Sequence, residues 1–399
     1  MNFDDTPEQA KFRAEARAWI AANRIEFASV AGGGFAAIRE WQRIKQKGGW
    51  GCLHWPKKYG GREATAIQSV IFSQEEEAAG VSILSVANMI TIGMAAATII
   101  HCGSDAQKDK HLPRIASGEE IWCQLFSEPV AGSDLAGIKT RAVRDGDEWV
   151  ITGQKVWTSY AQYADWAILV TRSDPTVPKH KGLTYFLLDM KSPGVEVRPI
   201  KQASGGSDFN EVFLDGVRVA DSNRVGDVGD GWRVALTTLM NERAAVASVF
   251  PTNFDDIWEI AKKTPLGEGL AIEDGAVRAL LADWYVWHRG LKNFSMRLQS
   301  ALSQGKTPGP EASSGKLLLG AQRQAFLSEA VDLLDIGGAA LASGKDMGLH
   351  FAFLRVIGNR IEGGSDEVLR NIIGERVLGL PSEPRVDKDT PFDQVPASR

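Results

Sequence analysis

Two polar segments in the middle of the chain carry residue types suited to holding a flat aromatic ligand with a polar edge. The first, residues 127–134, reads Ser-Glu-Pro-Val-Ala-Gly-Ser-Asp and places two hydroxyl groups in one loop. The second, residues 155–159, reads Lys-Val-Trp-Thr-Ser and sets an indole beside two more hydroxyls. Hydroxyls can donate to or accept from groups on a ring edge, while an indole packs against the ring. We therefore expect both segments to line one ligand site.

Short strands are expected to carry these two segments. Asp145, Gly146 and Asp147 have the chemistry of a tight hairpin turn, and a second hairpin would bring residues 155–159 back alongside the first loop. Short runs bounded by glycine, proline and aspartate continue the strand pattern from about residue 121 to residue 227. The pattern predicts a small β-barrel with both polar segments at its rim. An ordinary exposed meander is the alternative, since strand-turn-strand sequences are common.

Helical patterns flank the strands on both sides. Thr6 can cap a helix that starts at Pro7, and residues 12–20 then place apolar side chains on one helical face. The helical period returns after residue 231, with long amphipathic stretches at residues 276–304 and 313–334. The order is therefore helices, strands, helices, followed by a proline-containing polar tail that we expect to be loose.

The composition excludes several classes of protein. With 399 residues, 44% hydrophobic and 24% charged, the chain has the make-up of an ordinary globular protein of two or three domains. A net charge of −5 without a basic run leaves no electrostatic footprint for nucleic acid. The three cysteines and six histidines show neither metal-ligand nor disulfide spacing, so we expect a reducing compartment and no metal site.

One uncharged stretch has the length of a membrane span. Residues 80–100 contain no formal charge, and 21 residues are enough to cross a bilayer as a helix. Five serine, threonine and asparagine residues interrupt the stretch, and no lysine or arginine flanks it. We expect a buried helix instead. Because the N-terminus is acidic and then amphipathic, unlike a secretory signal, we expect a cytoplasmic protein with no membrane span.

Residues 124–159 resemble the middle domain of the flavin-dependent acyl-CoA dehydrogenases, whose pattern is T/S-E-P-x-A-G-S-D followed by G-x-K-x-W-x-T/S. Residues 103–119 resemble the same family in its segment G-(T/S)-x-x-Q-K…L-P-x-x-x-x-G-E. The resemblance implies an α+β fold with four parts: an N-terminal α-helical domain (residues 1–120), a middle β-barrel domain (121–230), a C-terminal four-helix-bundle domain (231–383) and the polar tail (384–399).

The resemblance also implies an activity, a cofactor and contact residues. FAD would be the cofactor, an acyl-CoA would be desaturated between its α and β carbons, and an electron-transfer flavoprotein would receive the electrons. Gln124 and Ser127 would face the flavin pyrimidine edge, and Ser159 would lie near flavin N5. Cofactor contacts are implied for Gln124, Phe126, Ser127, Ser133, Trp157, Ser159, Ser365 and Glu367, and substrate contacts for Ser133, Arg243 and Gly364.

Two positions in this family can supply the carboxylate that removes the α-proton. Aligning Gly364 and Ser365 with the family's closing glycine and threonine puts Gly363, which has no side chain, at the first position. Glu242 matches the second position, on the helix that follows the β-domain. The resemblance thus implies Glu242 as the base, with Glu362 as the alternative. Alternatively, Glu242 could be an ordinary glutamate on the helix surface that forms an ion pair.

Two departures concern the pyrophosphate half of the cofactor site. The family's R-x-x-F-G arginine is not recognisable in residues 251–269. Its Q-x-x-G-G-x-G segment appears as residues 332–338, where the glutamine is missing and Asp332 and Asp335 would repel a pyrophosphate. This combination resembles the α-type chains of two-subunit acyl-CoA dehydrogenases that act on bulky or sterol-side-chain acyl-CoAs.

The expected assembly is therefore a homotetramer or a heterotetramer, the latter with a sister acyl-CoA dehydrogenase subunit. Two other functions stay open at this point. A flavin oxidase or monooxygenase could share the fold, and the chain could be a non-catalytic partner subunit of a heteromeric enzyme.

Overall fold

The computed structural model describes residues 5–30, 34–81, 86–249, 253–303, 309–335, 338, 347–384 and 387–396, without the side chains of residues 25, 26, 28–30, 242–249, 299, 302, 303 and 347. The chain forms two compact units. Unit 1 comprises Met1–Ile200, Ser207–Ala245 and Glu383–Arg399, and unit 2 comprises Lys201–Gly206 and Val246–Ser382. The limits of the expected domains stay a prediction.

Unit 1 begins with a layer of helices. They are α1 (Pro7–Val30), α2 (Phe35–Lys47), η1 (Lys57–Tyr59), α3 (Ala66–Ala78), α4 (Val86–Asn88), the π-helical η2 (Met89–Ala96), α5 (Ala97–Cys102) and α6 (Asp105–Ala116). The expected cap is confirmed, since the Gln9 amide donates to the Thr6 hydroxyl at 3.3 Å. Thr65 and Ser104 cap α3 and α6 in the same way, each paired with a glutamine three residues on.

The uncharged stretch folds as a buried helix over its described part. Helices α4, η2 and α5 follow one another from residue 86 to residue 102, and Met94, Ala95, Ala96 and Ile99 are fully buried. Within the described ranges, no helix combines the length and the apolar character needed to cross a membrane. The expectation of a buried helix is therefore confirmed for residues 86–102.

Eight strands form the sheet of unit 1: β1 (Trp122–Leu125), β2 (Arg141–Asp145), β3 (Glu148–Ser159), β4 (Trp166–Arg172), β5 (Leu183–Asp189), β6 (Val195–Pro199), β7 (Phe209–Ala220) and β8 (Arg224–Val225). Their order is β6-β7-β3-β2-β4-β5-β8, and β1 pairs in parallel with β4. Asp145 pairs with Glu148, so Gly146 (φ 61°) and Asp147 make the predicted tight turn.

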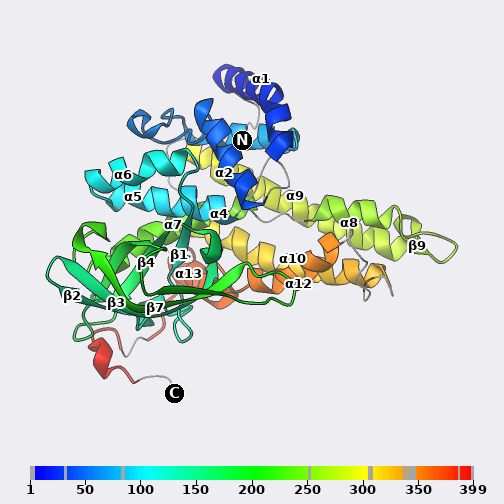
Figure 1. Cartoon of the computed structure of the whole chain (residues 1–399). Helices are drawn as coiled ribbons and strands as arrows, with labels where there is room; N and C mark the ends of the chain where they lie inside the picture. The colour runs from blue at the N-terminus through cyan, green and yellow to red at the C-terminus, as the bar shows by residue number, and fades with distance from the viewer. Residues whose placement is uncertain are drawn as a thin grey trace. The chain divides into compact units, whose positions relative to one another are not determined.

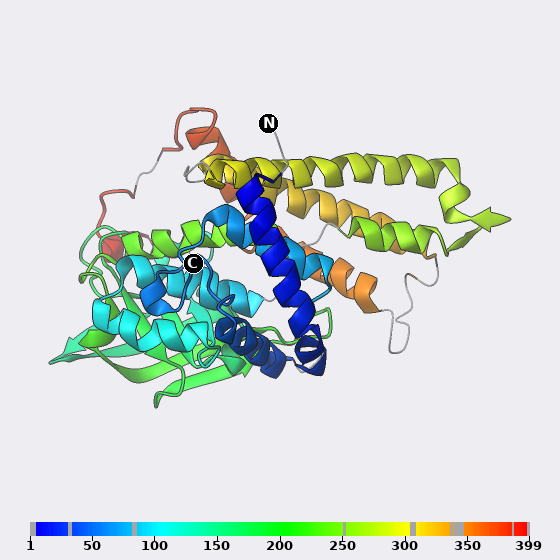
Figure 2. The same ribbon diagram turned by 90° about the horizontal axis from the view of Figure 1, so that it is seen from above.

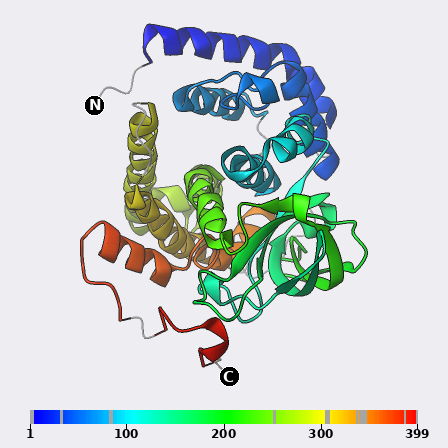
Figure 3. The same cartoon turned by 90° about the vertical axis from the view of Figure 1, so that its left-hand side faces the viewer.

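The sheet curls on itself, as Figure 3 shows, and encloses a core. Side chains from opposite walls meet inside it, among them Trp149, Leu169, Phe186 and Val212. A second apolar cluster joins the outer face of the sheet to the helices, and Figure 1 shows α5 and α6 along that face. The predicted barrel is therefore present, in an open form whose ladder ends at β6 and β8.

A chain of buried hydroxyls fixes α7 (Gly231–Val249) against this core. Thr238 of α7 lies 2.8 Å from the Thr98 hydroxyl of α5 and 3.0 Å from the Tyr185 hydroxyl of β5. All three side chains are fully buried, so each hydroxyl needs these partners. The contacts set the position of α7 in unit 1, and α7 is the helix that contains Glu242.

Unit 2 is helical. Its longer helices in the described ranges are α8 (Phe254–Ala261), α9 (Gly275–Ser303), α10 (Ser313–Leu333), α12 (Met347–Asn359) and α13 (Asp366–Arg376), with a small hairpin of β9 (Pro265–Leu266) and β10 (Gly269–Leu270). Figures 1 and 2 show α8, α9, α10 and α12 side by side. Trp284, Phe326 and Val356 meet in their shared core. Helices α9 and α10 coincide with the amphipathic stretches that the sequence predicted.

Residues 387–396 of the polar tail are docked rather than loose, contrary to expectation. After unit 2 it returns to the β-domain, where the short helix η8 (Phe392–Gln394) lies in Figures 1 and 3. The amides of Phe392 and Asp393 donate to the carbonyls of Val177 and Pro175, each at 3.0 Å. Sequence composition misses these main-chain hydrogen bonds because they leave no residue pattern.

Candidate functional site

The structure brings the two polar segments together at one end of the sheet. The loop that begins at Ser127 follows β1 directly, and residues 155–159 form the last part of β3. The amide of Val156 donates to the carbonyl of Ser127 at 2.9 Å, so the loop pairs with the strand at this point. The predicted proximity of the two segments is confirmed.

A buried ion pair fastens this junction. The Nζ atom of Lys155 lies 2.8 Å from Oε1 of Glu128 and donates to the carbonyl of Phe126 at 3.1 Å. Lys155 is fully buried, and Glu128 is 6% exposed. A buried charge is strongly unfavourable unless it is paired and hydrogen-bonded, so each of these two residues requires the other.

The Glu128 carboxylate also closes the loop that it begins. It accepts the amide of Lys139 at 2.6 Å and the amide of Thr140 at 2.9 Å. Burial alone would raise the pKa of the Glu128 carboxyl, but Lys155 and these backbone donors outweigh it and hold that pKa below its usual range. One ionised side chain thus connects the two ends of residues 128–140, which form the Ser133 loop.

The strand opposite the loop is irregular where it meets the site. The register between β3 and β7 shifts between Lys155 and Thr158, which marks a bulge. Trp157 follows with φ 58° and an indole that is 60% exposed. A left-handed backbone is rare for a bulky residue, and such strain gathers at functional sites. Here the bulge turns Lys155 inward and the indole outward.

The side chains with expected cofactor roles differ in accessibility. Ser127, Ser159 and Gln124 are half-buried, so part of each side chain can meet a ligand. Ser133 is exposed in the loop that Glu128 closes. Phe126 packs into the core edge-on against Tyr185, at 5.9 Å between ring centroids, and its carbonyl is taken by Lys155.

This donor set suits an aromatic ring with a polar edge. The exposed indole of Trp157 offers a flat apolar surface, and two partly accessible hydroxyls lie on the segments beside it. Hydroxyls serve as donors or acceptors, which a ring edge with alternating donors and acceptors requires. The residues expected at the flavin edge therefore fit such a ring.

The closing motif lies in unit 2. Ser365 caps α13 by accepting the amide of Val368 at 3.4 Å, and Glu367 is exposed with Arg370 at 3.6 Å. Gly363 and Gly364 have φ values of 62° and 95°, where glycine is favoured over other residues. The ammonium of Lys316 donates to the Gly364 carbonyl.

Glu362, the alternative base, is held by its neighbours. Arg355 donates to Oε2 of Glu362 at 2.6 Å, and the Asn359 amide donates to the other carboxylate oxygen. The side chain is 27% exposed. Both oxygens are therefore engaged in structural contacts at the end of α12.

The structure does not describe the side chains of some residues that were expected to belong to the site. The backbone of Glu242 and Arg243 belongs to α7, but their side chains are outside the described part. The described part also lacks residues 251–252 and 336–337, which belong to the two segments that depart from the family's pyrophosphate pattern. Asp332 and Asp335 are described, and both are exposed.

Among the described residues, no group of three or more histidine, cysteine and carboxylate side chains is placed to hold a metal ion. The three cysteines are free, and burial raises the pKa of the Cys52 thiol to about 12. The Cys52 thiol therefore provides no ready nucleophile.

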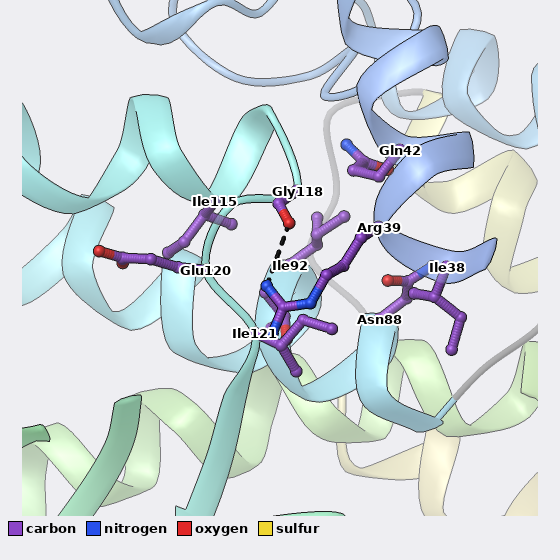
Figure 4. Close-up of a pocket in the computed structure, with 10 residues that line it drawn as sticks. Ile38, Arg39, Gln42, Asn88, Ile92, Ile115, Gly118, Glu120 and Ile121 are labelled. Atoms are coloured by element: carbon purple, nitrogen blue, oxygen red, sulfur yellow. Dashed lines mark hydrogen bonds between the residues drawn. The ribbon is translucent and has the colours of Figure 1, made fainter. Parts of the chain in front are cut away.

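A separate small pocket lies between the helices and the start of β1 (Figure 4). In it Arg39 donates to the carbonyl of Gly118 at 3.3 Å and to Asp165 at 2.8 Å. The same carboxylate oxygen accepts the amide of Ile121 at 3.0 Å. These contacts anchor β1, the strand that carries Gln124, and so support the site from behind.

Glu128, Lys155 and Arg172 support the site but were not predicted as site residues. Arg172, at the end of β4, is 4% exposed and donates to the carbonyls of Ala136 and Ile138 in the Ser133 loop, at 2.5 and 3.1 Å. The sequence could have indicated a buried role for Lys155, because it is a charged residue in an otherwise strand-like run.

Comparison with known proteins agrees with this arrangement. The chain matches three family models: acyl-CoA dehydrogenase N-terminal domain over residues 6–119, middle domain over residues 123–217 and C-terminal domain over residues 229–378. Acyl-CoA dehydrogenase IpdE1 of Mycobacterium tuberculosis is 36% identical over 386 residues, which cover 94% of this chain and 98% of that protein.

Solved structures give the same result. The ChsE4-ChsE5 complex from Mycobacterium tuberculosis is similar at a TM-score of 0.80 and 32% identity, over 96% of this chain and 100% of that one. The Tcur3481-Tcur3483 steroid ACAD is similar at a TM-score of 0.80 and 29% identity, with the same coverage. With its three domains matched in order and near full-length similarity to a curated member, the chain belongs to the acyl-CoA dehydrogenase family of oxidoreductases.

Proposed function

We propose that this protein is an FAD-dependent acyl-CoA dehydrogenase that desaturates an acyl-CoA thioester between its α and β carbons. One observation carries the proposal beyond family membership. The exposed indole of Trp157 and the half-buried hydroxyls of Ser127 and Ser159 stand on two segments that a main-chain bond and a buried ion pair hold together. Such rigid support is what a cofactor edge needs.

Ser127, Ser159 and Gln124 would hold the polar edge of the FAD ring, and Trp157 would pack beside it. When bound, FAD supplies the acceptor for the hydride that leaves the β-carbon. Donors placed at the ring edge stabilise the charge that reduction adds. The end of β3 would keep the Ser159 hydroxyl in place, because the side-chain amide of Asn210 donates to the carbonyl of the preceding residue, Thr158, at 3.0 Å.

Glu242 would remove the α-proton of the acyl-CoA, and Arg243 and Gly364 would line the acyl-CoA site. Two observations disfavour the closing motif as the source of the base. Gly363 has no side chain, and Arg355 and Asn359 engage both oxygens of Glu362. A general base must be free to reach the proton that it accepts.

An electron-transfer flavoprotein is the proposed electron acceptor. The purified protein should be yellow, and acyl-CoA should bleach it under anaerobic conditions without peroxide formation on return to air. Rapid peroxide formation would favour a flavin oxidase or monooxygenase of the same fold instead. A colourless protein that stays colourless with FAD and with a sister chain would favour a non-catalytic subunit.

The proposed substrate class is acyl-CoA with a bulky or steroid-derived acyl group, and the proposed assembly is a tetramer. The Tcur3481-Tcur3483 similarity supports the substrate class, because that protein is named a steroid ACAD. The ChsE4-ChsE5 similarity supports a heteromer, because that structure is a complex of two named chains. A panel of straight-chain and sterol-side-chain acyl-CoAs, compared by rate of flavin bleaching, tests the substrate class.

Replacing Ser127 and Ser159 together by alanine should weaken FAD retention. Each hydroxyl that is lost leaves a polar flavin group unpaired at a cost of about 1–3 kcal/mol. The measurement is FAD content after dialysis, and Thr152→Ala, on an exposed position earlier in β3, is the control. Undiminished FAD in the double variant would remove the two hydroxyls from the cofactor site.

Glu242→Gln should retain FAD while bleaching by acyl-CoA slows by about 10²–10⁴-fold, the usual contribution of a positioned base. Glu362→Gln is the matched control, and it should keep most of the bleaching rate because that carboxylate is bound to Arg355 and Asn359. Stopped-flow absorbance of the flavin measures both. The opposite ranking of the two variants would transfer the role of the base to Glu362.

Expressed alone, the protein should contain less than one FAD per chain, and co-expression with a sister acyl-CoA dehydrogenase chain should raise that ratio. The reason is that the expected pyrophosphate arginine is missing and that Asp332 and Asp335 stand in the matching segment. Absorbance ratios and mass photometry give the FAD content and the assembly. A homotetramer with full FAD occupancy would overturn the heteromer, though not the activity.

A further inference from the structure

The last described segment of the chain, residues 387–396, is docked on the β-domain and is called the C-terminal clamp below. Its amides at Phe392 and Asp393 bond to the carbonyls of Val177 and Pro175, and Pro391 pairs with Pro178 as an isolated antiparallel bridge. The clamp therefore runs along residues 175–178, in the connection between β4 and β5.

The clamp covers Arg172, whose guanidinium also holds the Ser133 loop. Arg172 donates to Ala136 and Ile138 of that loop and to the carbonyl of Lys179, the last at 3.1 Å. The ring of Phe392 lies against the guanidinium, 3.6 Å from its carbon to the ring centroid. Burial lowers the pKa of Arg172 to about 10, although nearby carboxylates oppose the shift. One guanidinium thus joins the loop to the clamp.

A second charge makes the same connection nearer to Ser133. The ammonium of Lys179 lies 3.0 Å from Asp134 of the loop and 2.9 Å from Asp387 of the clamp. The Lys179 side chain is only 15% exposed. Burial opposes the ammonium form, but the two carboxylates outweigh it and raise the pKa of Lys179. Without Lys179 the two carboxylates would repel each other.

We infer that the C-terminal clamp is a positioning element for the Ser133 loop. Asp134 follows Ser133 directly, so its contact with Lys179 restrains the hydroxyl that would meet the acyl-CoA or the cofactor phosphate. Phe392 and Asp387 act through Arg172 and Lys179 and touch no ligand themselves. The ligand part of this inference rests on the proposed function, whereas the restraint on residues 134–138 does not.

The test uses the full chain with its cofactor and, where required, its sister subunit. Phe392→Ala removes the ring over Arg172, and Asp387→Asn removes one charge from Lys179. Hydrogen exchange at residues 134–140 should become faster in both variants, while the hairpin around Gly146 should be unchanged. With an acyl-CoA that bleaches the flavin, KM should rise in both variants with little change in kcat, by about 2- to 30-fold in Phe392→Ala, the range expected from a lost cation–π contact.

Two matched variants distinguish the proposed positioning role from a general effect of changing a residue in the clamp. Phe392→Tyr keeps an aromatic face and should restore native exchange and KM. Asp389→Asn makes the same chemical change as Asp387→Asn at an exposed position of the clamp and should have no effect. Native exchange and native KM in both Phe392→Ala and Asp387→Asn would overturn the inference.

Failure of the proposed function would look different. If no acyl-CoA bleaches the unchanged protein, the proposed activity is wrong, and hydrogen exchange alone decides whether the clamp restrains the loop. If bleaching is normal and no clamp variant changes exchange or KM, the activity stands and the clamp has no positioning role.

Discussion

The arrangement of the site depends on one buried ion pair, Lys155 with Glu128. Both side chains are buried in unit 1, and their separation of 2.8 Å and three main-chain contacts leave them only one arrangement. A pair of this kind stabilises less than its Coulomb energy suggests, because desolvation offsets most of the gain. Its effect is on geometry. It fixes the end of β1, the start of the Ser133 loop and the bulge of β3 relative to one another.

From this pair a continuous set of contacts extends through the β-domain. Glu128 holds the amides of Lys139 and Thr140 at the far end of the loop, and Arg172 holds the carbonyls just before them. Lys179 and the C-terminal clamp add the outer layer. Charged side chains thus shape a loop whose proposed ligand contacts, such as Ser127 and Ser133, are small and neutral. This separation leaves those hydroxyls available to a ligand, because other residues maintain the backbone.

The parts of this architecture with local signals could be predicted from the sequence. The hairpin at Gly146, the cap at Thr6 and the amphipathic helices depend on neighbouring residues, and the structure contains all three. The partner of Lys155 lies 27 residues away, and pairing at that distance leaves no periodic pattern. The docking of the C-terminal clamp escaped for a related reason, since its main-chain bonds can be made by almost any residue. The base position rests on family resemblance, because the Glu242 side chain is outside the described part.

The most direct test of this account is the affinity of the cofactor-free protein for FAD across a double-mutant cycle at Lys155 and Glu128. Lys155→Met and Glu128→Gln should each weaken FAD binding. The double variant should have the same affinity for FAD as whichever single variant binds FAD less tightly, since both changes break the same support. Lys155→Met should also lower the free energy of unfolding by about 3–5 kcal/mol, because Glu128 is left buried without its partner. Native affinity for FAD in Lys155→Met, or strictly additive losses in the double variant, would contradict the account.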